Sequence, residues 1–497
     1  MPDGFESEHL DPTAEIALDT VKKKAVRGIV VLTGRTFLLS TLSLIAVGFL
    51  GAFLGFEEFG IFGVVSAVVN FLVYFSDIGL AASLIQKKEK VTETDLRTTF
   101  TVQQILVVTL LVVLYFTTPF IVRFYKLSQE GVYLLYALGA SFFLSSLKTI
   151  PSALLERKLD FERLVIPQIF ENIVYNVLIV FLAWKGFGIM SFTYSVLARG
   201  IVGLVVMYII KPWKPGVALS RTSLKGLLKF GVPYQVNTFL AVIKDDGLTA
   251  VLGGILGVGP MGILVWAQKW GQAPLRFFMD HVIKVTFPAF SRMQDKKDHL
   301  TRSVTRSIFF ICFLVFPSVI GLLVIAPVLV RVVPRYEQWI PALIPLSLVS
   351  INTVFAAAST QLTNMFNATG KIKLTFKLMI MWTVLTWMVV PFLAIKRGVV
   401  GAASGYALVG LTSIIVIYLA KKMINFSLTE SIIKPAIAAV VMGLITFAIK
   451  GVLSVSFTSV WLLIIAGMIS YFSVIYILYG SSIVVDIRKG INTLLSK

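Results

Sequence analysis

Long apolar segments separated by short polar connections dominate the sequence. Runs of 18 or more mostly apolar residues recur between Gly28 and Tyr479. A helix needs about 20 such residues to cross a hydrocarbon layer that is about 30 Å thick. Strands of a membrane barrel need only about 10 residues and alternate apolar with polar positions, which these runs do not do. The pattern therefore predicts an all-α protein that crosses the membrane many times.

The apolar runs can be divided into about fourteen membrane-spanning helices. We place these helices at 27–54, 59–86, 99–122, 130–155, 163–184, 189–211, 229–256, 260–287, 304–330, 338–367, 373–396, 398–421, 433–450 and 459–480. The connections between them are short, so the chain has little room for a separate soluble catalytic or ATPase domain.

Two pairs of similar stretches suggest an internal repeat. LGFEEFGI from Leu54 resembles LGVGPMGI from Leu256, and GFGIMSFTY from Gly186 can be aligned with GVVGAASGY from Gly398. The pairs occur in the same order and at corresponding helices, so they predict two pseudo-symmetric six-helix lobes followed by two appended helices. The predicted parts are a cytoplasmic tail (1–24), an N-lobe (25–211), a cytoplasmic linker (212–228), a C-lobe (229–421) and appended helices with a cytoplasmic C-terminus (422–497).

The composition agrees with a polytopic membrane protein. Hydrophobic residues make up 57% of the 497 residues, charged residues only 14%, and the mean hydropathy is +0.88, whereas soluble domains contain about 25% charged residues. The first 24 residues lack the apolar core of a cleavable signal peptide. The single Cys312 and three histidines without ligand spacing, His9, His281 and His299, argue against a disulfide framework or a zinc site. We expect no metal or organic cofactor.

Lys and Arg are distributed unequally between the two sides of the predicted membrane. Of the 45 basic residues, 30 lie in the segments on one side, 8 lie on the other side and 7 lie within helices. The positive-inside rule then predicts a multi-pass protein of the cytoplasmic membrane with both termini in the cytoplasm. The net charge of +20 is explained by this orientation and by contact with anionic lipids, so we expect no nucleic-acid partner.

Seven bases fall inside the predicted helices, where a charge near the bilayer centre costs roughly 2.5 to 3.5 kcal/mol. At about 100° per residue, Lys269, Arg276 and Lys284 share one helical stripe with Asp280, flanked by Trp266 and Gln272. Such a stripe is expensive unless it lines water. We therefore predict a hydrated cationic cavity that binds an anion, such as a pyrophosphate or an acidic sugar. Its predicted lining residues are Arg276, Lys269, Lys284, Lys244, Arg35, Lys148 and Arg199.

The acidic residues within helices leave two interpretations open. Asp77, Asp245 and Asp280 could couple transport to a proton or sodium gradient, or they could pair with bases. Asp280 with Arg276 on the same helix and Asp77 with Arg35 on the adjacent helix are candidate pairs. The membrane potential or the gradient of the substrate itself could also supply the energy.

Several motifs occur in a fixed order along the chain: FEEFG from Phe56, DIGLAASLIQKKEKVTETDLRTTF from Asp77, LERKLDF from Leu155 and LKFGVPYQ from Leu228, then LGVGPMG, KWGQAPLR and FPAFSRMQ. Over roughly residues 25–425 the chain resembles the polysaccharide transporter branch of the multidrug/oligosaccharidyl-lipid/polysaccharide exporter superfamily, in particular its colanic acid and teichuronic acid exporters. The resemblance implies two lobes that form a V around a central cavity and work by alternating access. It also implies a polyprenyl-pyrophosphate-linked oligosaccharide as cargo, flipped from the cytoplasmic to the outer leaflet.

The sequence favours a flippase over two alternatives. A cation-coupled multidrug antiporter of the same superfamily would need an acidic, aromatic cavity for organic cations, whereas the intramembrane charges here are mostly basic. A membrane-embedded polysaccharide polymerase or ligase would need a large external loop with acid and base residues. We expect a monomeric transporter and no enzyme activity. Its expected partners are the lipid-linked glycan and membrane lipids, with a polysaccharide polymerase or other export components as further candidates.

Overall fold

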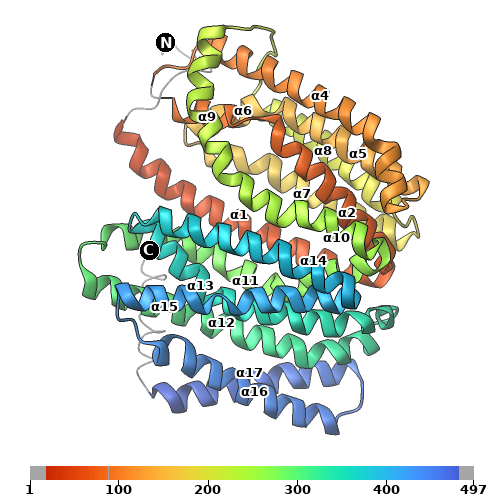
Figure 1. The fold of residues 1–497 in the computed structure, drawn as a ribbon, viewed down its shortest axis with the longest axis vertical. Helices are drawn as coiled ribbons and strands as arrows, with labels where there is room; N and C mark the ends of the chain where they lie inside the picture. The colour runs from red at the N-terminus through yellow and green to blue at the C-terminus, as the bar shows by residue number, and fades with distance from the viewer. Residues whose placement is uncertain (1–17, 88, 481–497) are drawn as a thin grey trace, which may run out of the picture. The chain divides into compact units, whose positions relative to one another are not determined.

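The computed structural model describes residues 18–87 and 89–480, and these residues form helices and turns without a strand (Figure 1). The chain divides into two compact units, Met1–Gly259 and Pro260–Lys497. The described elements of the first unit are α1 (Leu18–Phe53), α2 (Phe56–Val73), η1 (Tyr74–Ser76), α3 (Leu80–Gln86), α4 (Glu93–Tyr125), α5 (Gln129–Leu147), α6 (Thr149–Arg157), α7 (Phe161–Trp184), α8 (Met190–Ile210), α9 (Arg221–Val242), η2 (Ile243–Gly247) and α10 (Leu248–Leu256). The predicted tail at 1–24 lies mostly outside the described residues.

The second unit contains nearly all of α11 and the helices that follow it. Their bounds are α11 (Val258–Arg292), α12 (Lys297–Val332), η3 (Tyr336–Ala342), α13 (Leu343–Ala368), α14 (Ile372–Leu411), α15 (Ile414–Met423), η4 (Thr429–Ile433), α16 (Lys434–Val452) and α17 (Phe457–Tyr479). The two C-terminal helices, α16 and α17, run side by side and both pack on α12 (Figure 1). The buried face of α12, from Leu300 to Val330, supplies much of the apolar core of this unit.

Eleven segments of the described residues are long and apolar enough to cross a membrane. One of them, Ile372–Met423, has 52 residues and covers two predicted helices. Its path is broken at Arg397 and Gly398, whose backbone angles are not helical. The eleven segments include neither α9 and α10 nor α11, which carry the charged stretches. The all-α, multi-pass architecture is therefore confirmed, while the count of fourteen crossings stays a prediction.

The boundary between the compact units lies C-terminal to the predicted linker. Ser220 caps α9 by accepting a hydrogen bond from the backbone of Ser223 at 3.3 Å. The second half of the segment predicted as a linker, 212–228, is therefore helical. The α9 helix packs on α3 and α4, and α10 packs on α2. These contacts group α9 and α10 with the first unit, whereas the sequence repeat assigns them to the C-lobe, and the assignment by repeat stays a prediction.

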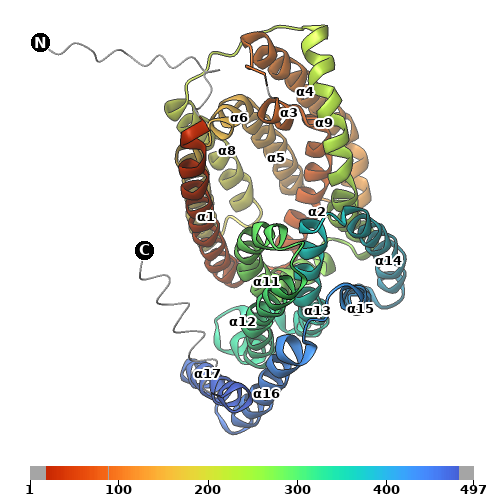
Figure 2. The ribbon, with the colours of Figure 1, turned by 90° about the vertical axis from the view of Figure 1, so that its left-hand side faces the viewer.

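The single helix predicted at 59–86 is wrong, because the chain breaks near its middle. The α2 helix ends at Val73, and Ile78 and Gly79 then adopt positive φ angles of 46° and 74°. The carboxylate of Asp77 accepts a hydrogen bond from the backbone N–H of Ala81 at 3.1 Å, which satisfies one of the free donors at the start of α3. The break turns α3 so that it lies against α6 and α9 (Figure 2).

Candidate functional site

Four charged side chains from different helices meet inside the first unit. Glu171 of α7 accepts a hydrogen bond on Oε1 from the Nζ of Lys148, which lies between α5 and α6. The Nε of Arg199 of α8 lies 3.9 Å from Oε2 of Glu171, and Arg35 of α1 interacts electrostatically with the same carboxylate. Two of the seven predicted bases, Lys148 and Arg199, therefore pair with one acid, and a third, Arg35, lies near enough to interact with its charge. We call these four residues the Glu171 cluster.

A break between two helices positions Lys148. The predicted helix 130–155 is divided at this residue into α5 and α6, three residues before Pro151. Proline has no backbone N–H, so it leaves the carbonyl of Leu147 without its helical donor. The hydroxyl of Tyr208 on α8 donates to that carbonyl at 3.0 Å and stabilises the break. Lys148 therefore lies at the junction of the two helices, and its side chain reaches Glu171.

The carboxylate of Glu171 is buried directly over a glycine of α8. Glu171 is only 7% exposed, and a Cβ added to Gly203 would lie 2.0 Å from its Oε1. The absence of a side chain at Gly203 is therefore what makes room for the carboxylate. Because Glu171 is buried and paired, it holds α5, α7 and α8 together through its two oxygen atoms.

The bases of the Glu171 cluster keep hydrogen-bond donors that Glu171 does not use. The Arg199 side chain is 50% exposed, and its guanidinium carbon lies 5.7 Å from the centre of the Tyr175 ring. The Nε of Arg35 is buried and has no hydrogen-bond partner among the described residues. With all four side chains ionised, three positive charges face one negative charge. The cluster therefore suits an additional anion.

A second set of predicted residues lies on α11, in the other unit. Lys269, Arg276 and Asp280 are exposed, whereas Leu264 and Ala267 are buried. The exposed residues therefore follow one face of the helix, as the 100° spacing predicts. The partly buried Lys284 continues this set.

Arg276 has a different partner from the predicted one. Its Nη2 donates to Oε1 of Gln272, one turn earlier, at 3.0 Å. No ion pair joins Arg276 to Asp280 in the part of the chain that the structure describes. Arg276 thus keeps most of its five N–H donors available. The neighbouring Asp280 does not compensate its positive charge.

Trp266 does not flank the exposed stripe of α11, which corrects the sequence interpretation. Its ring is buried and stacks on Trp339 of η3, with ring centres 5.0 Å apart and planes inclined by 11°. An offset stack of this kind adds to the burial of two large apolar surfaces. Trp266 therefore stabilises the second unit, whereas Gln272 contacts Arg276.

The remaining predicted residues have local partners. Lys244 donates to the adjacent Asp245 within η2, a π-helical turn. Asp77 accepts from the backbone at the start of α3, and no ion pair with Arg35 occurs among residues 31–87. Charge pairing is thus observed for Asp245 and backbone capping for Asp77, while a role of either acid in ion coupling stays a prediction.

Glu171 is a functional residue that the sequence analysis did not include in the predicted site. A signal was available: Glu171 has no base three or four positions away on its own helix, so its partners had to come from other helices. Gly203, Tyr175 and Tyr208 were missed as well. No pattern in the sequence marks them, because their roles follow from the packing of α8 against α5 and α7.

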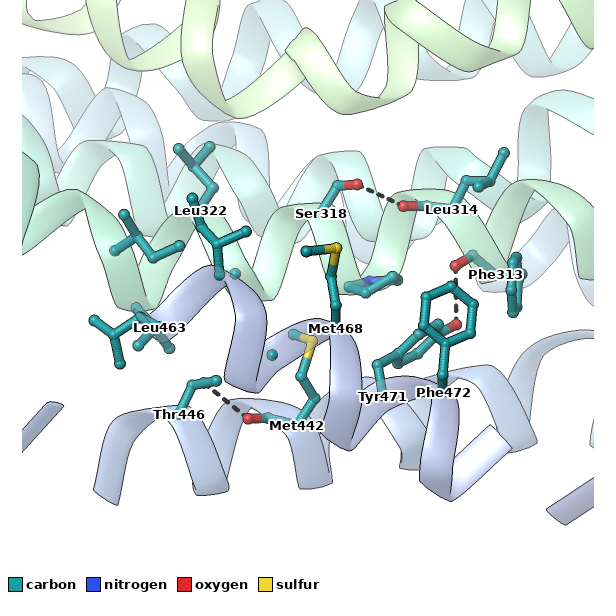
Figure 3. Close-up of a pocket in the computed structure, with 16 residues that line it drawn as sticks. Phe313, Leu314, Ser318, Leu322, Met442, Thr446, Leu463, Met468, Tyr471 and Phe472 are labelled. Atoms are coloured by element: carbon teal, nitrogen blue, oxygen red, sulfur yellow. Dashed lines mark hydrogen bonds between the residues drawn. The ribbon is translucent and has the colours of Figure 1, made fainter. Parts of the chain in front are cut away.

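An apolar groove lies between α12, α16 and α17, with a volume of about 380 Å³ (Figure 3). Three of its hydroxyl groups already bond to backbone carbonyls: Ser318 to Leu314, Thr446 to Met442, and Tyr471 to Phe313 at 2.9 Å. None of the described residues that line it is charged. The groove therefore offers contacts to hydrocarbon and none to the charged part of a ligand.

Comparison with known proteins relates this architecture to polysaccharide export. The family described as "Polysaccharide biosynthesis protein" matches residues 49–344, more than half of the chain. The teichuronic acid biosynthesis protein TuaB of Bacillus subtilis is 23% identical over 385 residues, which cover 75% of this chain and 78% of TuaB. The lipopolysaccharide biosynthesis protein WzxC of Escherichia coli is 24% identical over 42% of each chain.

Solved structures share the fold at low sequence identity. The lipid II flippase MurJ in an inward closed conformation superimposes with a TM-score of 0.74 at 17% identity, covering 91% of this chain and 99% of MurJ. An inward-facing multidrug transporter of the MATE family gives a TM-score of 0.61 at 15% identity, covering 78% of this chain and 94% of that protein. The superfamily predicted from the motifs is confirmed. This chain belongs to the polysaccharide biosynthesis protein family of membrane transporters within the multidrug/oligosaccharidyl-lipid/polysaccharide exporter superfamily.

Proposed function

We propose that the protein flips a polyprenyl-pyrophosphate-linked oligosaccharide, or a related anionic polysaccharide precursor, across the cytoplasmic membrane. The observation that carries the proposal is the Glu171 cluster, where Lys148 and Arg199 pair with a single carboxylate and Arg35 lies near it inside a membrane-embedded bundle. An excess of positive charge in such a bundle is costly unless an anion compensates it. Pyrophosphate has the charge and the oxygen geometry that guanidinium and ammonium groups bind well.

The exposed bases of α11 support the same chemistry. Lys269 and Arg276 lie about two helical turns apart, a spacing that suits successive contacts along an extended anionic glycan. The relatives are named for teichuronic acid and lipopolysaccharide biosynthesis and for transport of succinoglycan, and MurJ is named a lipid II flippase. We propose that the bases of both units contact the cargo in an alternating-access cycle, with both termini in the cytoplasm. Coupling to a proton or sodium gradient, through Asp77 or Asp245, is part of this proposal.

Reconstitution into liposomes tests the function. Purified protein is incorporated with fluorescently labelled polyprenyl-pyrophosphate oligosaccharides that carry either acidic or neutral sugars, and a membrane-impermeant quencher reports which leaflet holds the label. Faster loss of leaflet asymmetry than in protein-free liposomes is expected. A monophosphate lipid with the same glycan serves as the control for the pyrophosphate.

Two outcomes would contradict the proposal. If no lipid-linked glycan moves but an organic cation is exported against a proton or sodium gradient, the protein is a multidrug antiporter. If the glycan is lengthened or transferred to an acceptor, as mass spectrometry of the recovered lipids would detect, the protein is a polymerase or ligase.

A further inference from the structure

We propose that Glu171 is a tethered counter-ion. Its carboxylate pairs with Lys148 and Arg199 in the empty transporter, and an anionic group of the cargo displaces it from these bases on binding. The identity of the cargo rests on the proposed function, but the competition for the bases does not. A carboxylate and a phosphate accept hydrogen bonds from the same ammonium and guanidinium donors. Glu171 therefore acts as an internal competitor that positions the bases and limits how tightly they hold an external anion.

The arrangement of the bases leaves room for such an exchange. Arg199 reaches Glu171 at 3.9 Å, which is longer than a hydrogen bond. Half of its side chain is exposed, and its guanidinium also contacts the Tyr175 ring. A guanidinium has five N–H donors, so an anion can bind Arg199 before the contact with Glu171 is lost. The buried Nε of Arg35, which lacks a partner among the described residues, provides a further donor.

A counter-ion of this kind would help the transporter to release its anionic cargo. Three bases in a region of low dielectric attract a pyrophosphate strongly, and a transport site must also let its ligand leave. When the cargo departs, the carboxylate returns to Lys148 and Arg199, so these two bases regain a negative partner and the excess of positive charge is smaller than it would be without Glu171. Removing the negative charge should therefore raise the affinity for an anion and slow its release.

The position of the carboxylate can be tested separately from its charge. The side chain of Glu171 lies directly against Gly203: a Cβ added to this glycine would lie 2.0 Å from Oε1 and 2.6 Å from Cγ. Gly203→Ala should push the side chain of Glu171 away from Lys148 and leave every charge in place. Glu171→Asp retains the charge on a shorter side chain. Glu130→Gln is a matched control, since it removes one carboxylate at an exposed position in the first turn of α5.

Binding of inorganic pyrophosphate to the purified full-length protein, measured by isothermal titration calorimetry, is the direct experiment. We expect Glu171→Gln to bind pyrophosphate about tenfold or more tightly than the original protein, with the difference decreasing at high salt. Gly203→Ala should also bind more tightly, Glu171→Asp should stay within about threefold, and Glu130→Gln should be unchanged. Unchanged or weaker binding by both Glu171→Gln and Gly203→Ala would overturn the proposal and leave Glu171 a structural ion-pair partner. If Glu171→Gln does not fold, the pyrophosphate affinity of Gly203→Ala alone tests the proposal: tighter binding supports it, and unchanged or weaker binding overturns it.

Transport kinetics separate this proposal from the proposed function. In the liposome assay, Glu171→Gln should lower both the KM for the lipid-linked glycan and the kcat, because tighter binding slows release; a purely structural defect would lower kcat without lowering KM. If the original protein flips the glycan but Glu171→Gln does not change pyrophosphate affinity, the counter-ion role is wrong and the function stands. If the original protein flips no glycan while Glu171→Gln binds pyrophosphate more tightly, the function is wrong and the counter-ion role stands.

Discussion

Gly79 and Gly231 meet backbone to backbone, so closely that a Cβ on Gly79 would lie 2.3 Å from the carbonyl oxygen of Gly231. Conversely, a Cβ on Gly231 would lie 2.7 Å from the carbonyl oxygen of Ile78. Gly79 has a φ of 74° at the break between α2 and α3, a conformation that other L-residues rarely adopt. The two glycines therefore allow α3 and α9 to come into direct backbone contact.

This contact is the centre of a longer interface along one stripe of α9. The residues of the stripe are spaced four apart, so they lie on one face of the helix. Its described contacts are Ser223 with Asp95, Leu227 with Ser83, Gln235 with Tyr74, and Phe239 with the rings of Tyr74 and Phe75. The hydroxyl of Ser83 donates to the carbonyl of Leu227 at 2.7 Å. Since the stripe is continuous, a change at one position should weaken the whole interface.

Gly231→Ala should destabilise the protein by about 1–3 kcal/mol, because the added methyl group must displace the backbone of Ile78 and Gly79. Reversible unfolding in mixed micelles, followed by circular dichroism, measures this loss. Gly226→Ala is the control, since it lies on the same helix and its added Cβ would have no atom within 4 Å. That change should leave stability unaltered or raise it by about 0.5–1 kcal/mol. Equal effects of the two substitutions would contradict the close approach.

Asp95→Asn should cost about 1–3 kcal/mol of stability. The buried carboxylate accepts from Lys87 at 2.7 Å and from the backbone and hydroxyl of Thr92, each at 2.9 Å, on one oxygen, and from Ser223 on the other. Asparagine would place two N–H donors against groups that are themselves donors. The same unfolding measurement checks this expectation.

Glu93→Gln provides the control for Asp95→Asn. Glu93 forms an exposed i,i+4 pair with Arg97, and its side chain is 44% exposed. Such pairs contribute only about 0.3–0.5 kcal/mol, so this variant should unfold almost as the original protein does. A loss of stability as large as that of Asp95→Asn would show that charge alone, rather than the buried hydrogen bonds, explains the effect.

Arg276→Ala removes the positive charge and should reduce transport at least about tenfold. Arg276→Lys keeps the charge and should reduce transport less, but it should not restore full transport, because an ammonium cannot form the two parallel hydrogen bonds of a guanidinium. The flux of labelled lipid-linked glycan in liposomes measures both. Since Arg276 bonds to Gln272 and not to Asp280 in the described structure, the double variant Arg276→Ala, Asp280→Ala should remain as defective as Arg276→Ala. Recovery of flux in the double variant would instead make charge neutralisation the role of Arg276.

Labelling of single cysteines should establish the orientation predicted from the basic residues. Cysteines at Glu57 and Lys396 should react with a membrane-impermeant maleimide in intact cells, and cysteines at Lys296 and Lys422 only after the cells are permeabilised. All four positions are exposed, and the native Cys312 is buried, which should keep the background low. Labelling at Lys296 in intact cells would reverse the topology.

The membrane architecture could be predicted from the sequence because it depends on local composition. A segment such as 99–122 is apolar over enough residues to cross the bilayer whatever its neighbours are, and the structure has α4 there. The seven bases within helices could be recognised for the same reason, since the residue type and its position within an apolar run are both read directly from the sequence. The family motifs added the superfamily, which the comparisons confirm.

The helix breaks were harder to predict because they depend on contacts between helices. The break at Lys148 lies next to Pro151, but it is stabilised by Tyr208, which lies on another helix. The break at Ile78 and Gly79 likewise fits the contact with Gly231, more than 150 residues away in the sequence. A hydropathy average over a window of residues does not detect such breaks, so the helices on either side of each break were predicted as one continuous helix.

The sequence by itself determined which residues carry charge into the membrane, and only the tertiary structure decided which of them meet. Arg35, Lys148 and Arg199 are separated by long apolar segments, and no spacing rule connects them with Glu171. Packing of α1, α5, α7 and α8 brings them to one carboxylate, and the missing side chain of Gly203 determines where that carboxylate lies. The physical reason is that insertion energies are summed over each helix separately, whereas pairing energies depend on distances of a few ångströms between atoms of different helices.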